Sequence, residues 1–183
     1  MAAAPPTDEE ISLTVSANIE TKHCDLVVKL QRPGWIIRSV ILYSDTLFKG
    51  GSFVVHPSES SSQCVVPLSH PKNGPESVDV RILIGAGINA PFFFCHQIPA
   101  FQLRSFAFFA PLSTDQLQQT YIRANSHVKF SMRDVQLAQV EQWATSAFCL
   151  EDESAAGAIT KTDSQLVVRL LDVRSRDALH VQV

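Results

Sequence analysis

The chain lacks the long apolar stretch that a membrane-spanning helix needs. Of its 183 residues, 45% are hydrophobic and 18% are charged, but the longest apolar runs, such as 106–112, hold about seven residues, whereas a bilayer requires roughly 20. The N-terminal segment MAAAPPTDEE has neither a basic stretch nor an apolar core, so it is not a secretory signal. We expect residues 1–10 to form a disordered leader.

Cysteine is sparse and unclustered. The four cysteines, Cys24, Cys64, Cys95 and Cys149, lie far apart and form no C-x-x-C pair. Buried thiols in an intracellular protein fit this pattern better than disulfides do. The chain also has no Asn-X-Ser/Thr sequon, which agrees with a cytoplasmic location.

Basic charge is lacking as well. Lys and Arg number 15 against 18 Asp and Glu, which gives a formal net charge of −3. The basic residues are dispersed, and the aromatic residues alternate with apolar neighbours rather than with basic ones. A nucleic-acid binder or a direct binder of membrane surfaces would show a basic stripe or face, so neither partner is expected.

Residues 11–111 show the period-two alternation that is typical of half-buried strands. The clearest run places Val78, Val80, Ile82 and Ile84 on the face opposite Asp79 and Arg81. About eight such runs, separated by turns rich in Gly, Pro and Ser, predict an antiparallel β-sandwich with an immunoglobulin-like layout. The Cys…Trp…Cys spacing of antibody domains is missing. The expected core residues are Val40, Leu42, Val54, Val80 and Ile82.

After Pro111 the pattern changes to that of a small α+β module. Residues 112–126 are polar and form an expected connector, and residues 127–131 an expected strand. Ser131 and Asp134 stand at the spacing of a capping box and predict a helix start. The expected buried stripe of that helix consists of Val140, Trp143, Ala144, Ala147 and Phe148.

Two further alternating runs, 165–171 and 177–183, predict a hairpin that completes a partial module over 127–183. The pattern stops in mid-sheet at Val183. We therefore expect the chain to be a fragment that can associate with itself through an open sheet edge.

No motif for catalysis, metal binding or cofactor binding appears. Cys95 and His96 are neighbours, but adjacent residues of a strand point to opposite faces, so they form no dyad. Gly85-Ala-Gly87 lacks the third glycine and the helix of a dinucleotide fingerprint. The remaining candidates are scattered or lie in polar flanks: His23, His56, His70, His96, His127, His180, Glu9-Glu10 and Glu151-Asp-Glu153. We expect no enzyme activity, no cofactor and no metal.

The phenylalanine-rich stretch 91–101 allows two interpretations. Two strands can bury these aromatic faces inside the sandwich, or the rings can line an exposed groove or sheet edge that receives another chain. The Trp143 stripe offers the same choice, because it can pack on the small sheet or leave part of its surface for a partner subunit. The sequence identifies no partner-binding residue.

Three segments resemble the BBSome subunit 2 family, the Bardet–Biedl syndrome 2 proteins. They are IRSVILYSDTLFKGGSFVVHP at 37–57, QIPAF at 97–101, and HVKFS at 127–131 with the Trp143 helix and FCLED at 148–152. The resemblance spans roughly residues 10–183. Its most specific part is the Phe-x-Gly-x-Ser-x-Val-Val-His-Pro pattern, which runs here from Phe48 to Pro57 with its glycine at position 50 and one further glycine at position 51.

The resemblance implies a mainly β chain with a gamma-adaptin-ear-like sandwich and the first part of a platform. The family's propeller, coiled coil and C-terminal helices have no counterpart in it. A non-enzymatic fragment of a coat-like complex is implied, one that carries membrane proteins into and out of cilia. Implied partners are other BBSome subunits, namely the related subunits 7 and 9; subunit 7 has a similar layout. The implied location is the cytoplasm, cilium, ciliary base and, through the complex, the ciliary membrane.

A different class of function stays open beside this one. An adaptor-type appendage domain would bind phenylalanine-containing peptides of accessory proteins. A basic pocket beside an exposed groove would favour that alternative.

Overall fold

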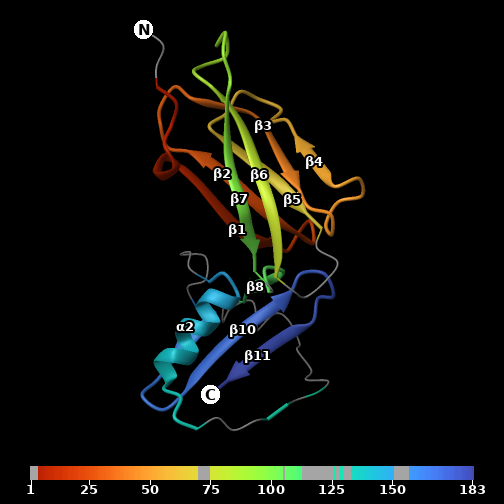
Figure 1. Cartoon of the computed structure of the whole chain (residues 1–183). Coiled ribbons are helices and arrows are strands. Elements are labelled where there is room, and N and C mark those ends of the chain that lie inside the picture. The colour runs from red at the N-terminus through yellow and green to blue at the C-terminus, as the bar shows by residue number, and fades with distance from the viewer. Residues whose placement is uncertain are drawn as a thin grey trace. The chain divides into compact units, whose positions relative to one another are not determined.

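The fold consists mainly of antiparallel sheets and divides into two compact units (Figure 1). The computed structural model describes residues 4–69, 75–104, 106–112, 126, 128–129, 133–150 and 157–183. One unit comprises residues 1–16 and 23–105, and the other comprises 17–22 and 106–183. Each unit is described by itself.

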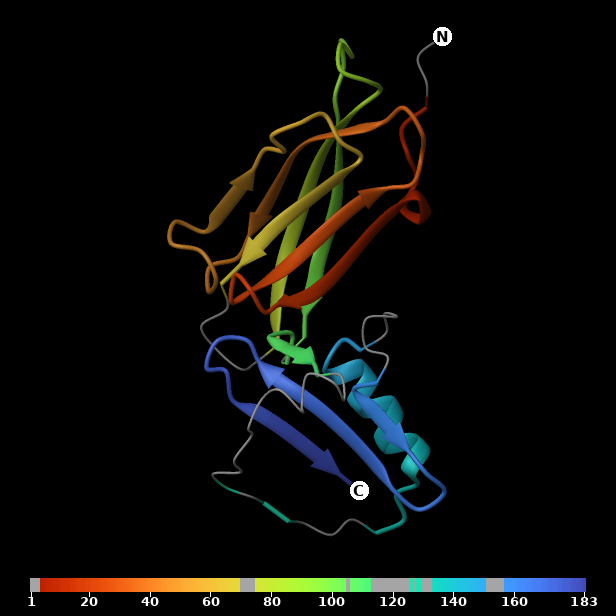
Figure 2. The same ribbon diagram turned by 180° about the vertical axis from the view of Figure 1, so that it is seen from behind.

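The first unit is a two-layer β-sandwich, as the sequence predicts. One sheet has the order β1-β2-β5, and the other has the order β4-β3-β6-β7. The strands are β1 (Ile11–Asn18), β2 (His23–Leu30), β3 (Ile36–Tyr43), β4 (Ser52–Val55), β5 (Gln63–Leu68), β6 (Glu76–Gly85) and β7 (Phe94–Leu103), preceded by the 3-10 turn η1 (Asp8–Glu10). Figure 2 shows the three-stranded sheet lying in front of the four-stranded one.

Alternating side chains of both sheets fill the space between the layers. Leu26 and Val28 of β2 and Val66 of β5 are at most 1% exposed. Four of the five expected core residues, Val40, Leu42, Val80 and Ile82, are fully buried at 0% exposure. Burial of such side chains is the main favourable term in folding, at roughly 25 cal/mol per Å² of apolar surface.

The prediction that Val54 lies in the core is wrong. In the pairing of β4 with β3, Phe53 stands opposite Leu42 and Val54 stands opposite Ile41. Because directly opposite residues share one face of a sheet, Phe53 shares the inner face with buried Leu42. Val54 therefore points outward and is 47% exposed. Both residues are apolar, so only the register between the strands decides which of them faces inward; Phe53, on the inner face, is itself 37% exposed.

The second unit is a helix packed on a small sheet. Its elements are β8 (Phe109–Pro111), α2 (Leu137–Ala147), β9 (Ile159–Lys161), β10 (Leu166–Asp172) and β11 (Ala178–Gln182). The sheet order is β11-β10-β8, with β9 also pairing β10. The predicted hairpin corresponds to β10 and β11. β8 belongs to this sheet, although sequence analysis places residues 109–111 before the domain boundary.

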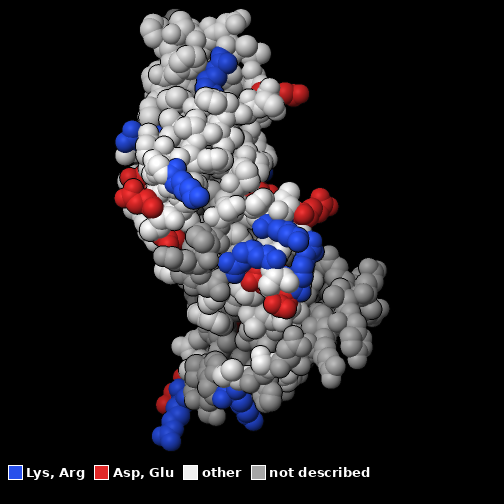
Figure 3. All heavy atoms as spheres, turned by 90° about the vertical axis from the view of Figure 1, so that its right-hand side faces the viewer, with Lys and Arg blue, Asp and Glu red and all other residues white. Residues whose placement is uncertain are grey.

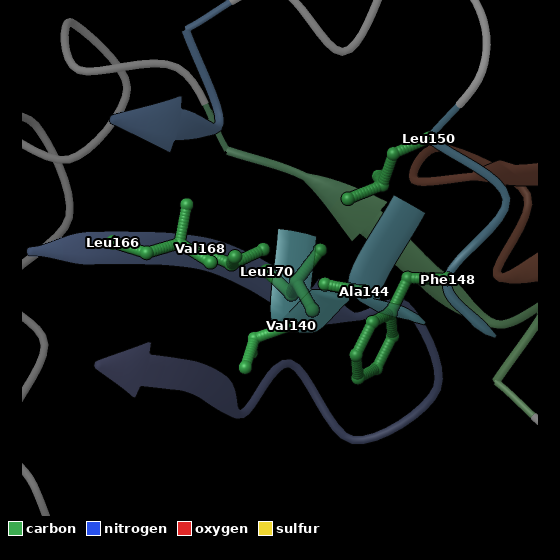
Figure 4. Close-up of a cluster of buried hydrophobic side chains, with 7 residues drawn as sticks. All are labelled: Val140, Ala144, Phe148, Leu150, Leu166, Val168 and Leu170. Atoms are coloured by element: carbon green, nitrogen blue, oxygen red, sulfur yellow. The ribbon is translucent and has the colours of Figure 1, made fainter. Parts of the chain in front are cut away.

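One apolar cluster joins the helix to the sheet. Figure 4 shows the side chains of α2 and of the segment after it meeting those of β10. The cluster consists of Val140, Ala144, Phe148, Leu150, Leu166, Val168 and Leu170. The spacing of Val140, Ala144 and Phe148 is four residues, which places them on one face of a helix.

The predicted start of the helix is wrong. Asp134 has φ 61°, a left-handed conformation outside the helix. The helix begins at Leu137, after Gln136, whose backbone N–H donates to Gln139 Oε1 at 2.9 Å. This contact is one of the two hydrogen bonds that define a capping box. Here glutamine occupies both the N-cap position, 136, and the N3 position, 139.

Other predictions fall partly or wholly outside the described residues. In the predicted strand 127–131, the described residues are Val128 and Lys129, and neither lies in a strand. His127 and Ser131 are not described, and neither is 113–125, which makes up most of the expected connector.

Candidate interaction surface

β7 places the phenylalanine-rich stretch at an exposed edge of the sandwich. The strand pairs with β6 on one side and is the last strand of its sheet. Phe92 is 70% exposed, Phe93 55% and Phe94 36%. Of the two interpretations of this stretch, the structure therefore supports the exposed edge, since most of these rings are not buried between the sheets.

The aromatic tip consists of Ile88, Phe92 and Phe93, in the hairpin loop between β6 and β7. Figure 1 shows this loop projecting beyond the neighbouring strands of its unit. Ile88 is 64% exposed and follows Gly87, whose φ is 86°. Exposed apolar side chains that gather in this way are typical of surfaces that bind another molecule.

The ring of Phe93 is held in place although it is exposed. A Cβ added to Gly85 would lie 3.2 Å from Phe93 Cδ1, so the ring sits directly against the glycine backbone. The guanidinium of Arg38 lies 5.3 Å from the ring centroid, a cation–π distance. Arg38 Nη2 also donates to the carbonyls of Ile88 and, at 3.4 Å, Gly87. Within the tip, the Phe93 ring is therefore held by contacts of the chain itself.

The open edge consists of Phe94–Ile98, the first half of β7. Its second half carries features that oppose pairing with another strand: Pro99 lacks an N–H, and Ala100 has φ 53° at an irregularity in the register. The N–H of Ala100 donates instead to Asp79 Oδ1 at 2.8 Å. Phe94–Ile98 contains no proline and no Asp, Glu, Lys or Arg, so this half of the edge is the part suited to strand addition.

Cys95 and His96 lie on opposite faces of β7, as expected. Cys95 stands opposite Leu83, and His96 stands opposite Ile82, which is buried. His96 Nε2 lies 3.6 Å from Asp8 Oδ1. Phe94, on the same inner face, packs its ring 5.6 Å from that of Trp35.

The expected buried stripe of α2 is wrong at Trp143. Val140, Ala144 and Phe148 are buried, but Trp143 is 51% exposed. Its ring contacts Phe148 edge-on at 5.9 Å and lines a shallow groove. The groove is formed by Gln139, Gln142, Trp143, Ser146 and Ala147. None of these side chains carries a charge, so they make no basic pocket.

In the part of the chain that the structure describes, no group of three or more His, Cys, Asp or Glu residues could hold a metal ion. His70, His127 and the acidic run Glu151–Glu153 lie outside that part. Nor is any described helix long and apolar enough to cross a membrane.

The pKa shifts of Glu10 and Cys64 arise from hydrogen bonds and burial within the fold. Hydrogen bonds from the Thr7 backbone and the Arg32 side chain lower the pKa of Glu10. Burial raises the pKa of the Cys64 thiol. On the face shown in Figure 3, the described Lys and Arg side chains form separate groups, several of them beside Asp or Glu, without a continuous basic stripe.

No sequence motif points to Arg38 or Ile88 as a functional residue. A signal for Arg38 was present, because it is the one charged residue in the apolar run 35–43. Its place beside Phe93 depends on the pairing of β3 with β6, which brings together residues about 50 positions apart.

The comparisons with known proteins match both units of the chain. Residues 18–106 match the family model described as the BBS2 GAE domain. The chain is 26% identical over 146 residues to a mouse protein named BBSome complex member BBS2, covering 79% of this chain and 19% of that protein. The human protein of that name is 25% identical over 146 residues, which again are 79% of this chain and 19% of that protein.

The zebrafish protein of the same name is 29% identical over 103 residues, which are 53% of this chain and 14% of that protein. The chain therefore spans about a fifth of the length of the mouse and human proteins that it matches.

Proposed function

The chain belongs with the BBS2 proteins and carries their GAE domain, and we propose on this basis that it is a non-enzymatic interaction module of a BBSome subunit. In this role it helps to assemble a coat-like complex that moves membrane proteins to and from cilia. The observation that carries the proposal is the coincidence of the family match at 18–106 with the open edge and the aromatic tip.

The proposed partners are other BBSome subunits, in particular the related subunits 7 and 9. The relatives' printed name, BBSome complex member, supports membership of such an assembly. The chain would then work in the cytoplasm, at the ciliary base and in the cilium, and would meet the ciliary membrane through the complex.

A passive role agrees with the chemistry of the described side chains. Enzymes need titratable groups that converge on a pocket, with one group activating another. Cys95 and His96, which are neighbours in the sequence, face opposite sides of β7. The Ser69 hydroxyl lies 3.1 Å from His23 Nδ1, at an exposed position.

Peptide capture in the manner of an adaptor appendage is the second candidate function. The exposed ring of Trp143 beside a groove favours it. The uncharged lining of that groove does not supply the basic pocket that would recognise an acidic peptide. We therefore rank this function below subunit assembly.

The proposal is tested by measuring binding of the chain to purified subunits 7 and 9. The variant Phe92→Ser/Phe93→Ser removes the aromatic tip, and we expect it to weaken binding about tenfold or more, as loss of exposed aromatic anchors does at interfaces. Val65→Ser is the matched control, since Val65 is 44% exposed on β5 of the other sheet.

Absence of binding to either subunit by the wild-type chain would contradict the proposal. If both variants lose binding equally, the aromatic tip is not part of the proposed interface. Selective capture of phenylalanine-containing peptides, abolished by Trp143→Ala, would instead favour the appendage function.

A further inference from the structure

We propose that Thr7 is a phosphorylation site for a protein kinase that prefers acidic residues after its target, and that the phosphate releases the N-terminal strap. The strap consists of residues 4–10, which precede β1 and include η1. A bond forms between Thr7 Oγ1 and the γ-phosphorus of ATP, the bond from that phosphorus to ADP breaks, and the hydroxyl proton passes to the base of the kinase. The inference goes beyond the proposed function and does not depend on it.

The sequence after Thr7 is the first part of the argument. Thr7 is exposed and is followed directly by Asp8, Glu9 and Glu10. Kinases select their substrates partly by the pattern of charges around the hydroxyl. Three carboxylates at the next three positions therefore suit a kinase whose substrate groove is basic.

One arginine holds the strap to the sandwich. Arg32, in the turn between β2 and β3, donates through Nε to Glu10 Oε1 at 2.8 Å, and its Nη2 lies 2.7 Å from Glu10 Oε2. Its Nη1 donates to the carbonyls of Ala4 at 2.7 Å and of Pro5 at 3.1 Å. Pro6, between these contacts, is buried. All three nitrogens of the guanidinium are therefore already engaged by the strap.

The hydroxyl of Thr7 belongs to the same set of contacts. Its Oγ1 donates to Glu10 Oε2 at 3.3 Å, and the backbone N–H of Thr7 donates to the same oxygen at 2.9 Å. Hydrogen bonds from Thr7 and Arg32 lower the pKa of Glu10, so this carboxylate is ionised at neutral pH. Phosphorylation would replace the hydroxyl donor by acceptor oxygens directly beside a negative charge.

The charge that phosphorylation adds decides the direction of the effect. Asp8, Glu9 and Glu10 are three acidic residues, and a phosphate adds about 1.5 to 2 further negative charges at pH 7. Among the described residues, the strap's carboxylates form their ion pairs with Arg32 and, at 3.6 Å, His96. A phosphate would bind Arg32 only by displacing Glu10 or a strap carbonyl. Either exchange breaks contacts that hold the strap, and the crowded negative charges repel one another.

The first test is modification of the full chain by casein kinase 2, a kinase that prefers acidic residues, with ATP. Mass spectrometry of the chain and its fragments locates the phosphate. We expect modification at Thr7 and its loss in Thr7→Val. Thr160 is an internal control: it is also exposed and has Asp163 three residues later, but it is followed by Lys161 and lies in β9, so it should stay unmodified.

Hydrogen exchange then measures how firmly the strap is held. The amides of Glu10 and Gln31 report on it, because the first donates to the Thr7 carbonyl at 3.0 Å and the second to the Glu10 carbonyl at 2.8 Å. We expect both amides to exchange about tenfold faster after phosphorylation, since hydrogen bonds to a charged group are lost. In Arg32→Gln both amides should already exchange fast, and phosphorylation should change their rates little.

Two variants serve as matched controls. Thr7→Glu should reproduce part of the faster exchange, whereas Thr14→Glu, which adds the same charge at an exposed position of β1, should not. Arg81→Gln removes an arginine of β6 that covers the ring of Tyr43, and should leave the response to phosphorylation intact. Circular dichroism confirms that each variant is folded before rates are compared.

A chain that the kinase leaves unmodified, or modifies elsewhere than at Thr7, would overturn the inference. Unchanged or slower exchange of Glu10 and Gln31 after phosphorylation of Thr7 would overturn it too, because the phosphate would then leave the strap in place. A full response in Arg32→Gln, or equal acceleration in Thr14→Glu, would have the same consequence. Binding to subunits 7 and 9 is measured separately, so the proposed function stands or falls without these results.

Discussion

The carboxylate of Asp172 organises the turn that follows β10. It accepts hydrogen bonds from the backbone N–H of Arg174 at 2.9 Å and from Arg174 Nη2 at 3.0 Å. Arg174 in turn covers the ring of Phe108 at 4.7 Å. Burial alone would raise the pKa of Asp172, but the hydrogen bonds from Arg174 outweigh it and hold the pKa below the ordinary value of 3.8.

This shift predicts how stability depends on pH. A carboxylate whose pKa is lower in the folded chain stabilises the fold above its unfolded pKa, and that contribution is lost as the pH falls through the folded pKa. Asp172→Asn should cost about 1 kcal/mol at neutral pH. When the pH is lowered from 5 to below about 3, the thermal midpoint of the variant should fall less than that of the wild type.

Thermal melting followed by circular dichroism measures this difference. Asp163→Asn, at an exposed position, is the control and should follow the wild-type pH profile. A variant at Asp172 that keeps the full pH dependence would show that its contacts with Arg174 do not stabilise the fold.

At the scale of the element, turns decide how the strands connect. Gly34 lies between β2 and β3 with φ 79°, and no atom lies within 4 Å of the position where its Cβ would be. The backbone conformation alone therefore demands glycine there, because a left-handed conformation costs other residues roughly 1–2 kcal/mol.

Gly34→Ala should lower the free energy of unfolding by about 1 kcal/mol. Gly34→Asn should lower it less, because asparagine tolerates the left-handed region better. Urea denaturation followed by fluorescence compares the two variants. Equal stability of wild type and Gly34→Ala would mean that the turn relaxes to a negative φ.

The helix shows which part of an element can be predicted locally. Its buried face follows from the four-residue spacing of Val140, Ala144 and Phe148. Its start did not follow from Ser131 and Asp134, because the glutamines at 136 and 139 form the reciprocal contact. The prediction that Trp143 is buried was wrong for a different reason. Helical periodicity indicates a broad apolar face, but the width of the sheet beneath the helix decides how much of that face is covered.

At the scale of the whole molecule, each unit contains one of the two tryptophans. Trp35 is 4% exposed in the sandwich, and Trp143 is 51% exposed on α2. Replacing one tryptophan by phenylalanine therefore leaves the other as a fluorescence probe of its own unit. The stability of the sandwich and that of the second unit can then be measured separately.

Val80→Asp should unfold the sandwich, because Val80 is fully buried and an unpaired charge there costs several kcal/mol. In the Trp143→Phe background, the emission of Trp35 should shift to the red. Val54→Asp is the matched control: the same substitution at a site that is 47% exposed should leave the emission unchanged. A melting curve of Val80→Asp identical to the wild type would contradict the assignment of β6 to the core.

The sequence alone determined the mainly β class, the sandwich, four of its five expected core residues, the helix and the final hairpin. These follow from short-range periodicity, since side chains of a strand alternate and those of a helix repeat every 3.6 residues. The resemblance to the BBSome subunit 2 family also came from the sequence, and residues 18–106 bear it out.

Only the tertiary structure decided that Val54 faces outward, that Trp143 is half exposed, and that β7 forms an edge with Arg38 beside Phe93. Each of these depends on which strands pair, in which register, and which of them has a neighbour on one side only. Contacts of that kind join residues far apart along the chain, so no local pattern of hydrophobicity specifies them.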